Sequence, residues 1–186
     1  MSAAVQIVGV FLSIAALTVL LPILLPVKLL RLIPVISSTI SLQFAYDEYA
    51  FLSRWVQPAY RAEADALLPA WFTSWGPWGT NVVFGSFATS LASGLANFLA
   101  GRDVQGTAVG RYWYAAGVGF ATAHLLVWGP TALKLLAMIR KGEPEGRTTV
   151  SMSKWLEMHR SRSFLVDLPA VVCFVAALLS VVDAVA

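Results

Sequence analysis

The sequence contains very little charge. Of its 186 residues, 13 are Lys or Arg and 10 are Asp or Glu, so that 12% are charged while 58% are hydrophobic. A soluble domain typically carries about 25% charged residues. The apolar residues also form long runs instead of the three-to-four spacing of a half-exposed helix. These features exclude a soluble globular fold. They predict an all-α polytopic transmembrane helical bundle that forms one membrane domain over residues 1–186.

Residues that bind metals or cofactors are also scarce. Cys173 is the single cysteine, which excludes an intramolecular disulfide, and its apolar surroundings favour a buried, inert thiol. One Cys and two His give no metal-ligand spacing. The chain has no GxSxG, P-loop, dinucleotide or CxxCH haem motif. We therefore predict no metal and no cofactor. No basic face interleaved with aromatics occurs, so nucleic acid is not an expected partner.

What the sequence does contain is apolar segments, and there are five of them. A membrane-spanning helix needs about 20 residues, and four segments reach that length. The second is marginal, because it is short, begins near Arg31 and carries several hydroxyl groups. It is either a polar-faced span or a re-entrant or interfacial helix. The Trp- and Pro-rich stretch 47–79 is predicted to be a cytosolic or interfacial lid. The segments cover about 4–26 (an additional N-terminal helix), 30–46, 80–100, 112–139 and 164–185.

The basic residues between these segments predict the topology. The connection between the last two segments holds six of them, and the connection before it holds only Arg102 and Arg111. The positive-inside rule then places the more basic connection in the cytosol, together with 47–79. We expect a multi-pass protein of an endomembrane such as the endoplasmic reticulum. Its expected partners are the lipid bilayer and a lipophilic small molecule, and a homo-oligomer is a further expectation. The six basic residues in the connection between the last two segments are Arg140, Lys141, Arg147, Lys154, Arg160 and Arg162.

Polar residues inside a membrane are costly, so each is a candidate for function. Thr39, Gln43 and Asp47 form a stripe at i, i+4 and i+8 on one face of the second segment. The third segment carries Gly85, Thr89, Ser93 and Asn97 at the same spacing. Packing of small residues between helices explains its glycines and serines. Gln43, Asp47 and Asn97 remain candidates for substrate binding, because an amide or carboxyl group in lipid must find a partner.

His124 lies deep in the fourth segment. Small residues and Trp128 share its helical face, which would leave room for a flat ligand. The alternative is a neutral histidine hydrogen-bonded to a neighbouring helix. Pro130 cannot donate a backbone bond to the carbonyl of Leu126, so a kink is expected one turn beyond His124.

A second polar group precedes the last segment. Trp155, His159 and Arg162 share one helical face, and Asp167 follows just inside the membrane. An interfacial anchor would explain the arginines, but it explains His159 and Asp167 less well. A buried carboxylate needs a partner, and Arg160 or Arg162 is expected to provide it.

The order of these parts resembles the anthrone oxygenase-like family of small fungal membrane proteins, over roughly residues 30–186. The resemblance rests on four sequence elements. They are Leu52-Ser-Arg-Trp55, the kinked stretch His124–Pro130, Lys154-Trp155-x3-His159-x2-Arg162, and Val166-Asp167-Leu168-Pro169-Ala170. It implies a cofactor-independent oxygenase of secondary metabolism that oxidises an anthrone-like aromatic polyketide with molecular oxygen.

Such an oxygenase needs a base, a donor that stabilises an anion, and an apolar pocket. The candidates for catalysis are His124, His159 and Arg162. The candidates for substrate binding are Asn97, Gln43, Asp47, Trp128, Trp155 and Asp167. The small residues around His124 favour it as the substrate-facing base, whereas the resemblance favours His159, which belongs to the shared signature, so both stay candidates. Two other hypotheses remain: an acid–base cyclase or isomerase that acts on a lipophilic intermediate, and a non-enzymatic membrane adaptor.

Overall fold

The structure, a computed structural model, describes residues 3–100 and 108–182, with side chains from Gly9 to Ser180. Arg102 and the last residues of the fifth predicted segment lie outside these ranges. Within them, every regular element is helical, which confirms the all-α fold. The helices are α1 (Ala3–Leu24), α2 (Val27–Leu52), α3 (Arg61–Leu99), α5 (Ala108–Ala123), α6 (Gly129–Arg140), α7 (Thr148–Arg162) and α8 (Leu168–Val182).

Several of these helices continue into one another. Two π-helical turns, η3 (His124–Trp128) and η4 (Ser163–Asp167), join α5 to α6 and α7 to α8. In the described ranges, four continuous stretches are long and apolar enough to cross a membrane, as expected for a multi-pass membrane protein. The second predicted segment, marginal in sequence, belongs to one of them. The stretches are Val27–Val56, Pro58–Leu99, Ala108–Arg140 and Thr148–Ser180.

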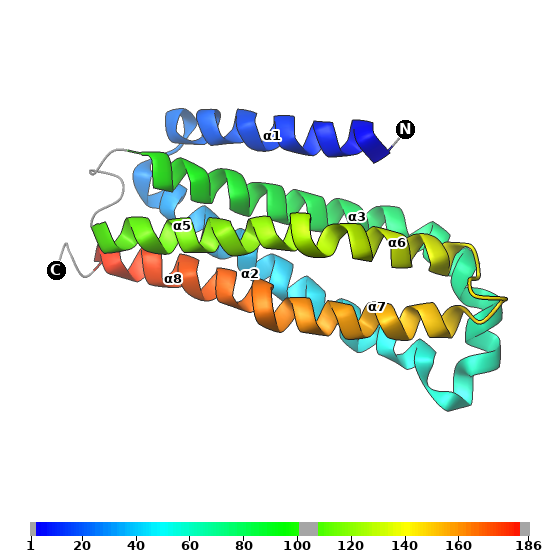
Figure 1. The fold of residues 1–186 in the computed structure, drawn as a ribbon. Coiled ribbons are helices and arrows are strands. Elements are labelled where there is room, and N and C mark those ends of the chain that lie inside the picture. The colour runs from blue at the N-terminus through cyan, green and yellow to red at the C-terminus, as the bar shows by residue number, and fades with distance from the viewer. Residues whose placement is uncertain (1–2, 101–107, 183–186) are drawn as a thin grey trace.

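The long stretches run back and forth along one axis, and α1 lies along the outside of the bundle against α3 (Figure 1). The α2–α3 connection and the α6–α7 turn lie at the same end of the molecule (Figure 1). This arrangement agrees with the expectation that residues 47–79 and the basic connection share one side of the membrane.

The stretch 47–79 is helical and continuous with the bundle, and its cytosolic or interfacial position stays a prediction. It contains the end of α2, two short 3-10 turns (Ser53–Val56 and Pro58–Tyr60) and the first half of α3. The helix that contains the third predicted segment therefore starts at Arg61 and has 39 residues, more than the roughly 20 that a span requires. Pro69 and Pro77 lie inside α3 without ending it.

The aromatic residues of this stretch explain why it joins the bundle. Trp71 and Trp75 lie one turn apart on α3 and stack, with centroids 5.4 Å apart and planes 12° apart. Trp71 also meets Phe51 of α2, at a centroid distance of 5.7 Å. Such rings bury a large apolar area and stabilise the α2–α3 contact.

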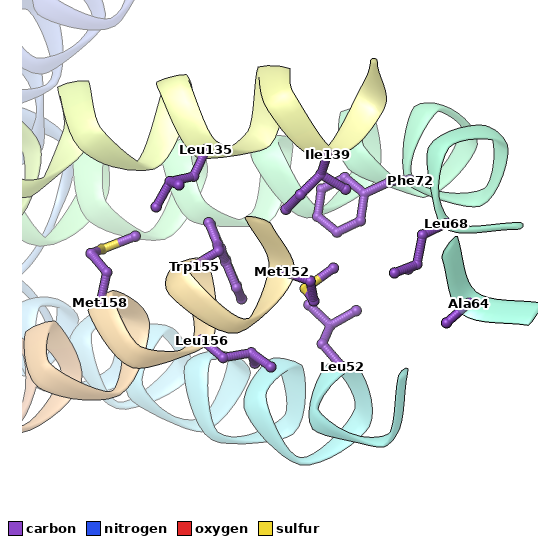
Figure 2. Close-up of a cluster of buried hydrophobic side chains, with 10 residues drawn as sticks. All are labelled: Leu52, Ala64, Leu68, Phe72, Leu135, Ile139, Met152, Trp155, Leu156 and Met158. Atoms are coloured by element: carbon purple, nitrogen blue, oxygen red, sulfur yellow. The ribbon is translucent and has the colours of Figure 1, made fainter. Parts of the chain in front are cut away.

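The largest core cluster lies at this same end, where α3, α6, α7 and the end of α2 meet (Figure 2). Asp65 of α3 caps α7, because its carboxylate accepts a 2.6 Å hydrogen bond from the backbone N–H of Thr149. The core residues are Leu52, Ala64, Leu68, Phe72, Leu135, Ile139, Met152, Trp155, Leu156 and Met158.

At the other end of the bundle, small residues allow α3, α5 and α8 to pack closely. A Cβ atom added to Gly94 or Gly117 would lie 2.9 Å or 2.6 Å from Cε1 of Phe174. The prediction of packing between small residues of the third segment holds for Gly94. Gly85 is different, since nothing lies within 4 Å of an added Cβ atom there.

Candidate functional site

The two π-helical turns bring the candidate residues together. Each turn ends shortly before a proline, Pro130 or Pro169, and a proline leaves one backbone carbonyl of the preceding turn without its helical partner. Where the sequence predicted a kink beyond His124, the structure has the π turn η3. Single π turns inside α-helices occur frequently at functional sites. Here they place His124, the first residue of η3, opposite Asp167, the last residue of η4.

His124 and Asp167 form a buried pair. Nδ1 of His124 lies 2.7 Å from Oδ1 of Asp167, and the two residues are each 3% exposed. A carboxylate accepts hydrogen bonds, so Nδ1 of His124 donates to Asp167. The phenyl ring of Phe87 packs on the imidazole with a centroid distance of 3.7 Å.

Arg162 joins this pair to His159. Its Nη2 donates a 2.8 Å hydrogen bond to Nδ1 of His159. Its Nε lies 3.5 Å from Oδ2 of Asp167, within ion-pair range but without hydrogen-bond geometry. The predicted partner of Asp167 is thus Arg162, with His124 as a second partner; Arg160 is exposed.

His159 is held on both nitrogens. Nε2 lies 2.8 Å from the carbonyl oxygen of Ala45, which can only accept, so this nitrogen carries the proton. Nδ1 accepts from Arg162, because a guanidinium only donates. His159 is therefore a neutral ring with both positions occupied, which leaves it poorly placed to act as a base. Trp155 stacks on it at a centroid distance of 4.5 Å and an interplanar angle of 20°.

Glu48 is the site residue that the sequence analysis missed. It is 8% exposed, and Oε2 lies 3.8 Å from Nδ1 of His159. Because that nitrogen accepts from Arg162, the contact is not a charged pair. The sequence did contain a pattern that indicates a buried position for Glu48. In α2, Ser37, Ser41 and Ala45 form a buried face of small residues that continues to Glu48. Small residues of this kind mark the packed face of a membrane helix.

One cavity of about 260 Å³ adjoins this network. That volume lies near the lower end of the roughly 300–1,000 Å³ typical of small-molecule sites. Its polar lining side chains are Glu48, Thr80 and Arg162. The other lining residues are apolar residues, aromatics and glycines: Val10, Phe11, Phe72, Trp75, Gly76, Gly79, Val83, Phe84, Leu125, Leu126, Gly129, Pro130, Ala132, Leu133, Leu136 and Trp155.

The cavity is not where the sequence placed it. We expected a pocket among the small residues beside His124, but the side chain of Phe174 fills the space at Gly94 and Gly117. Among the described residues that line the cavity, His124 is absent. The structure thus places Arg162 and Glu48, and not His124, against the cavity.

Four predicted substrate-binding residues lie apart from this site. Asn97 is buried, and its Nδ2 donates to the carbonyls of Leu30 and Ser93, at 2.9 Å and 2.8 Å. Gln43 and Asp47 hydrogen-bond to each other at 2.9 Å on the exposed face of α2. Trp128 is half-buried and packs against the core cluster of Figure 2. Of the predicted binding residues, only Trp155 and Asp167 join the network.

No metal-type arrangement is found among the residues that the structure describes, since no three His, Cys, Asp or Glu side chains converge there. The absence of a cofactor stays a prediction. What the arrangement offers chemically is an apolar cavity with one guanidinium and one carboxyl group at its wall.

Comparison with known proteins identifies the family. The chain is 42% identical over 157 residues to the epoxidase pydX of an Acremonium species, across 84% of this chain and 96% of pydX. It is 42% identical to the probable epoxidase scpX of Mollisia scopiformis, across 82% of this chain and 96% of scpX. It is 36% identical to the epoxidase gkaX of Penicillium citrinum, across 82% of this chain and 94% of gkaX. The chain belongs to this family of fungal epoxidases.

Membership in the epoxidase family makes the chain an enzyme of the oxidoreductase class, and the hypothesis of a non-enzymatic adaptor is set aside. The resemblance inferred from the sequence is confirmed at the level of a fungal oxidative enzyme. The three relatives are named epoxidases and not anthrone oxygenases. No family model and no solved structure matches the chain.

Proposed function

We propose that this protein is a membrane-embedded oxygenase that uses molecular oxygen to epoxidise a lipophilic, conjugated substrate bound in the cavity. The observation that carries this proposal is the cavity itself, whose apolar wall becomes charged where Glu48 and Arg162 face it. An aromatic polyketide of fungal secondary metabolism, anthrone-like in its acidity, is the substrate class that we favour. Because such a compound partitions into lipid, an endomembrane such as the endoplasmic reticulum is the proposed location.

The cavity offers one group to remove a proton and one to stabilise the resulting anion. Glu48 acts as the base on an acidic C–H or O–H of the substrate, and Arg162 stabilises the developing negative charge. Asp167 and His124 hold the guanidinium from the side away from the cavity, and His159 fixes it through Nη2. His124 and His159 are therefore positioning residues in this proposal.

The oxidation needs no external reductant when the substrate anion supplies the electrons. The anion transfers one electron to O₂, and the two radicals combine into a hydroperoxide that regains the proton from Glu48. The distal peroxide oxygen is then delivered to a neighbouring C=C bond. The O–O bond breaks, an epoxide forms, and the other oxygen remains as a hydroxyl group. The substrate thus gains both atoms of O₂ and loses none of its own.

Isotope labelling tests this balance. Membranes that contain the protein are supplied with substrate under ¹⁸O₂, and the product is analysed by mass spectrometry. We expect oxygen uptake without added NAD(P)H or flavin, and a product that carries two labelled oxygen atoms. One labelled atom together with a requirement for a reductant would contradict the cofactor-independent route. Turnover without oxygen uptake would instead support the acid–base cyclase or isomerase hypothesis.

A further inference from the structure

The indole N–H of Trp155 is a buried donor at the cavity wall that has no hydrogen-bond partner within the described part of the chain. Trp155 and Arg162 both line the cavity, and they are 3% and 6% exposed. Nε of Arg162 lies 3.5 Å from Oδ2 of Asp167, so the guanidinium meets the cavity through its other atoms. A buried donor without a partner costs free energy, so a native protein that keeps this N–H beside a cavity needs an explanation.

His159 holds the side chains of Trp155 and Arg162 in place. Its ring stacks against Trp155 and accepts a hydrogen bond from Arg162, while the carbonyl of Ala45 fixes its other nitrogen. The two donor side chains are therefore pre-organised through one rigid ring. Pre-organised donors in a site that excludes water favour binding of a negatively charged oxygen.

We propose that Trp155 and Arg162 form a subsite for an ionisable oxygen of the substrate. This inference rests on the proposed function and narrows the substrate class. The substrate is a lipophilic conjugated compound that carries a phenolic or enolic oxygen. Its oxygen accepts from the indole N–H and lies beside the guanidinium, while its ring system occupies the apolar remainder of the cavity. Because both groups only donate, the subsite selects an acceptor and disfavours a cationic ligand.

Binding of two probes that differ in one oxygen tests the subsite without any oxidation. Naphthalene and 2-naphthol share the same ring system and are titrated against the purified full chain in lipid nanodiscs, with empty nanodiscs subtracted. We expect the wild-type protein to bind 2-naphthol about tenfold more tightly than naphthalene, the size of effect of one hydrogen bond to a favourable donor. Equal binding of the two probes by the wild-type protein would overturn the proposal, and this comparison needs no variant.

A Trp155→Phe variant then identifies the donor. It keeps an aromatic ring against His159 and removes the indole N–H, so we expect the ratio of the 2-naphthol and naphthalene affinities to fall towards one. Its thermal midpoint should fall modestly, because Trp155 packs in the core cluster and Phe is smaller; the ratio of the two affinities is therefore the readout. The control is Trp71→Phe, since Trp71 is half-buried on α3 and lies outside the cavity lining.

Other outcomes contradict the subsite in distinct ways. A Trp155→Phe variant that keeps the 2-naphthol preference, or that weakens both probes equally, would show that the indole N–H does not bind the oxygen. Oxygen uptake with no probe preference would overturn the subsite alone, whereas probe preference without oxygen uptake would overturn the proposed function.

Discussion

At the scale of single residues, the site depends on which of two adjacent carboxylates faces inward. Asp47 and Glu48 follow each other on α2, yet Asp47 is exposed and Glu48 is buried at the cavity. This pair provides a matched test of the proposed base.

We expect Glu48→Gln to lower kcat by about 10²–10⁴-fold, the usual contribution of a general base. The amide has nearly the same shape, so the folded protein should be retained. Turnover measured in membranes at matched expression checks this, with Asp47→Asn as the control that keeps wild-type turnover. Near-normal turnover of Glu48→Gln would exclude it as the base.

Asp167 is the second residue whose charge matters. Asp167→Asn leaves Arg162 buried beside a neutral amide, although the side-chain oxygen can still accept from His124. We expect a loss of stability on the order of 1–3 kcal/mol, somewhat below the full cost of breaking a buried ion pair, because the contact between Arg162 and Asp167 is 3.5 Å long. Thermal unfolding in nanodiscs measures this effect. A wild-type midpoint would show that the carboxylate charge is not needed for stability.

At the scale of elements, the contact of α5 with α8 depends on a glycine. Gly117→Ala places a Cβ atom 2.6 Å from the ring of Phe174, and overpacking of this kind costs typically about 1–3 kcal/mol. Gly119 is the control on the same helix, because nothing lies within 4 Å of its added Cβ atom.

We therefore expect Gly117→Ala to lower the unfolding midpoint and Gly119→Ala to leave it unchanged or raise it slightly. If both variants unfold alike, α5 and α8 do not pack as closely as described. The π turn η3 follows α5, and η4 precedes α8. A shift of one helix against the other should therefore also move the site residues on these turns and reduce turnover.

At the scale of the whole molecule, the orientation in the membrane is a prediction that a labelling experiment can decide. The single cysteine can be removed by Cys173→Ala, and new cysteines can then be placed at Glu145, in the α6–α7 turn, and at Val109, at the opposite end of the bundle. An impermeant thiol reagent should reach the cysteine at position 145 from the cytosolic side and that at 109 only from the luminal side. Reversed labelling would mean that the topology is inverted.

The sequence by itself determined the class of fold. Long apolar runs predict membrane helices, because the thickness of the bilayer sets the length of a span and burial of charge in lipid is costly. Local spacing also placed Trp155, His159 and Arg162 on one face, since residues three and four apart are neighbours on a helix. Because a buried carboxylate needs a partner, the sequence also predicted that Asp167 pairs with Arg160 or Arg162, and the partner in the structure is Arg162.

Only the tertiary structure decided where the cavity lies and which polar residues reach it. The rotation of α2 is set by its packing against other helices, and it turns Glu48 inward while Gln43 and Asp47 face outward. Phe174, 50 positions along the chain from His124, fills the space that the small residues would otherwise leave open. The extent of α3 likewise follows from aromatic contacts between helices, not from the hydropathy of the segment. Contacts between residues distant in sequence determine these features, and no local sequence pattern encodes such contacts.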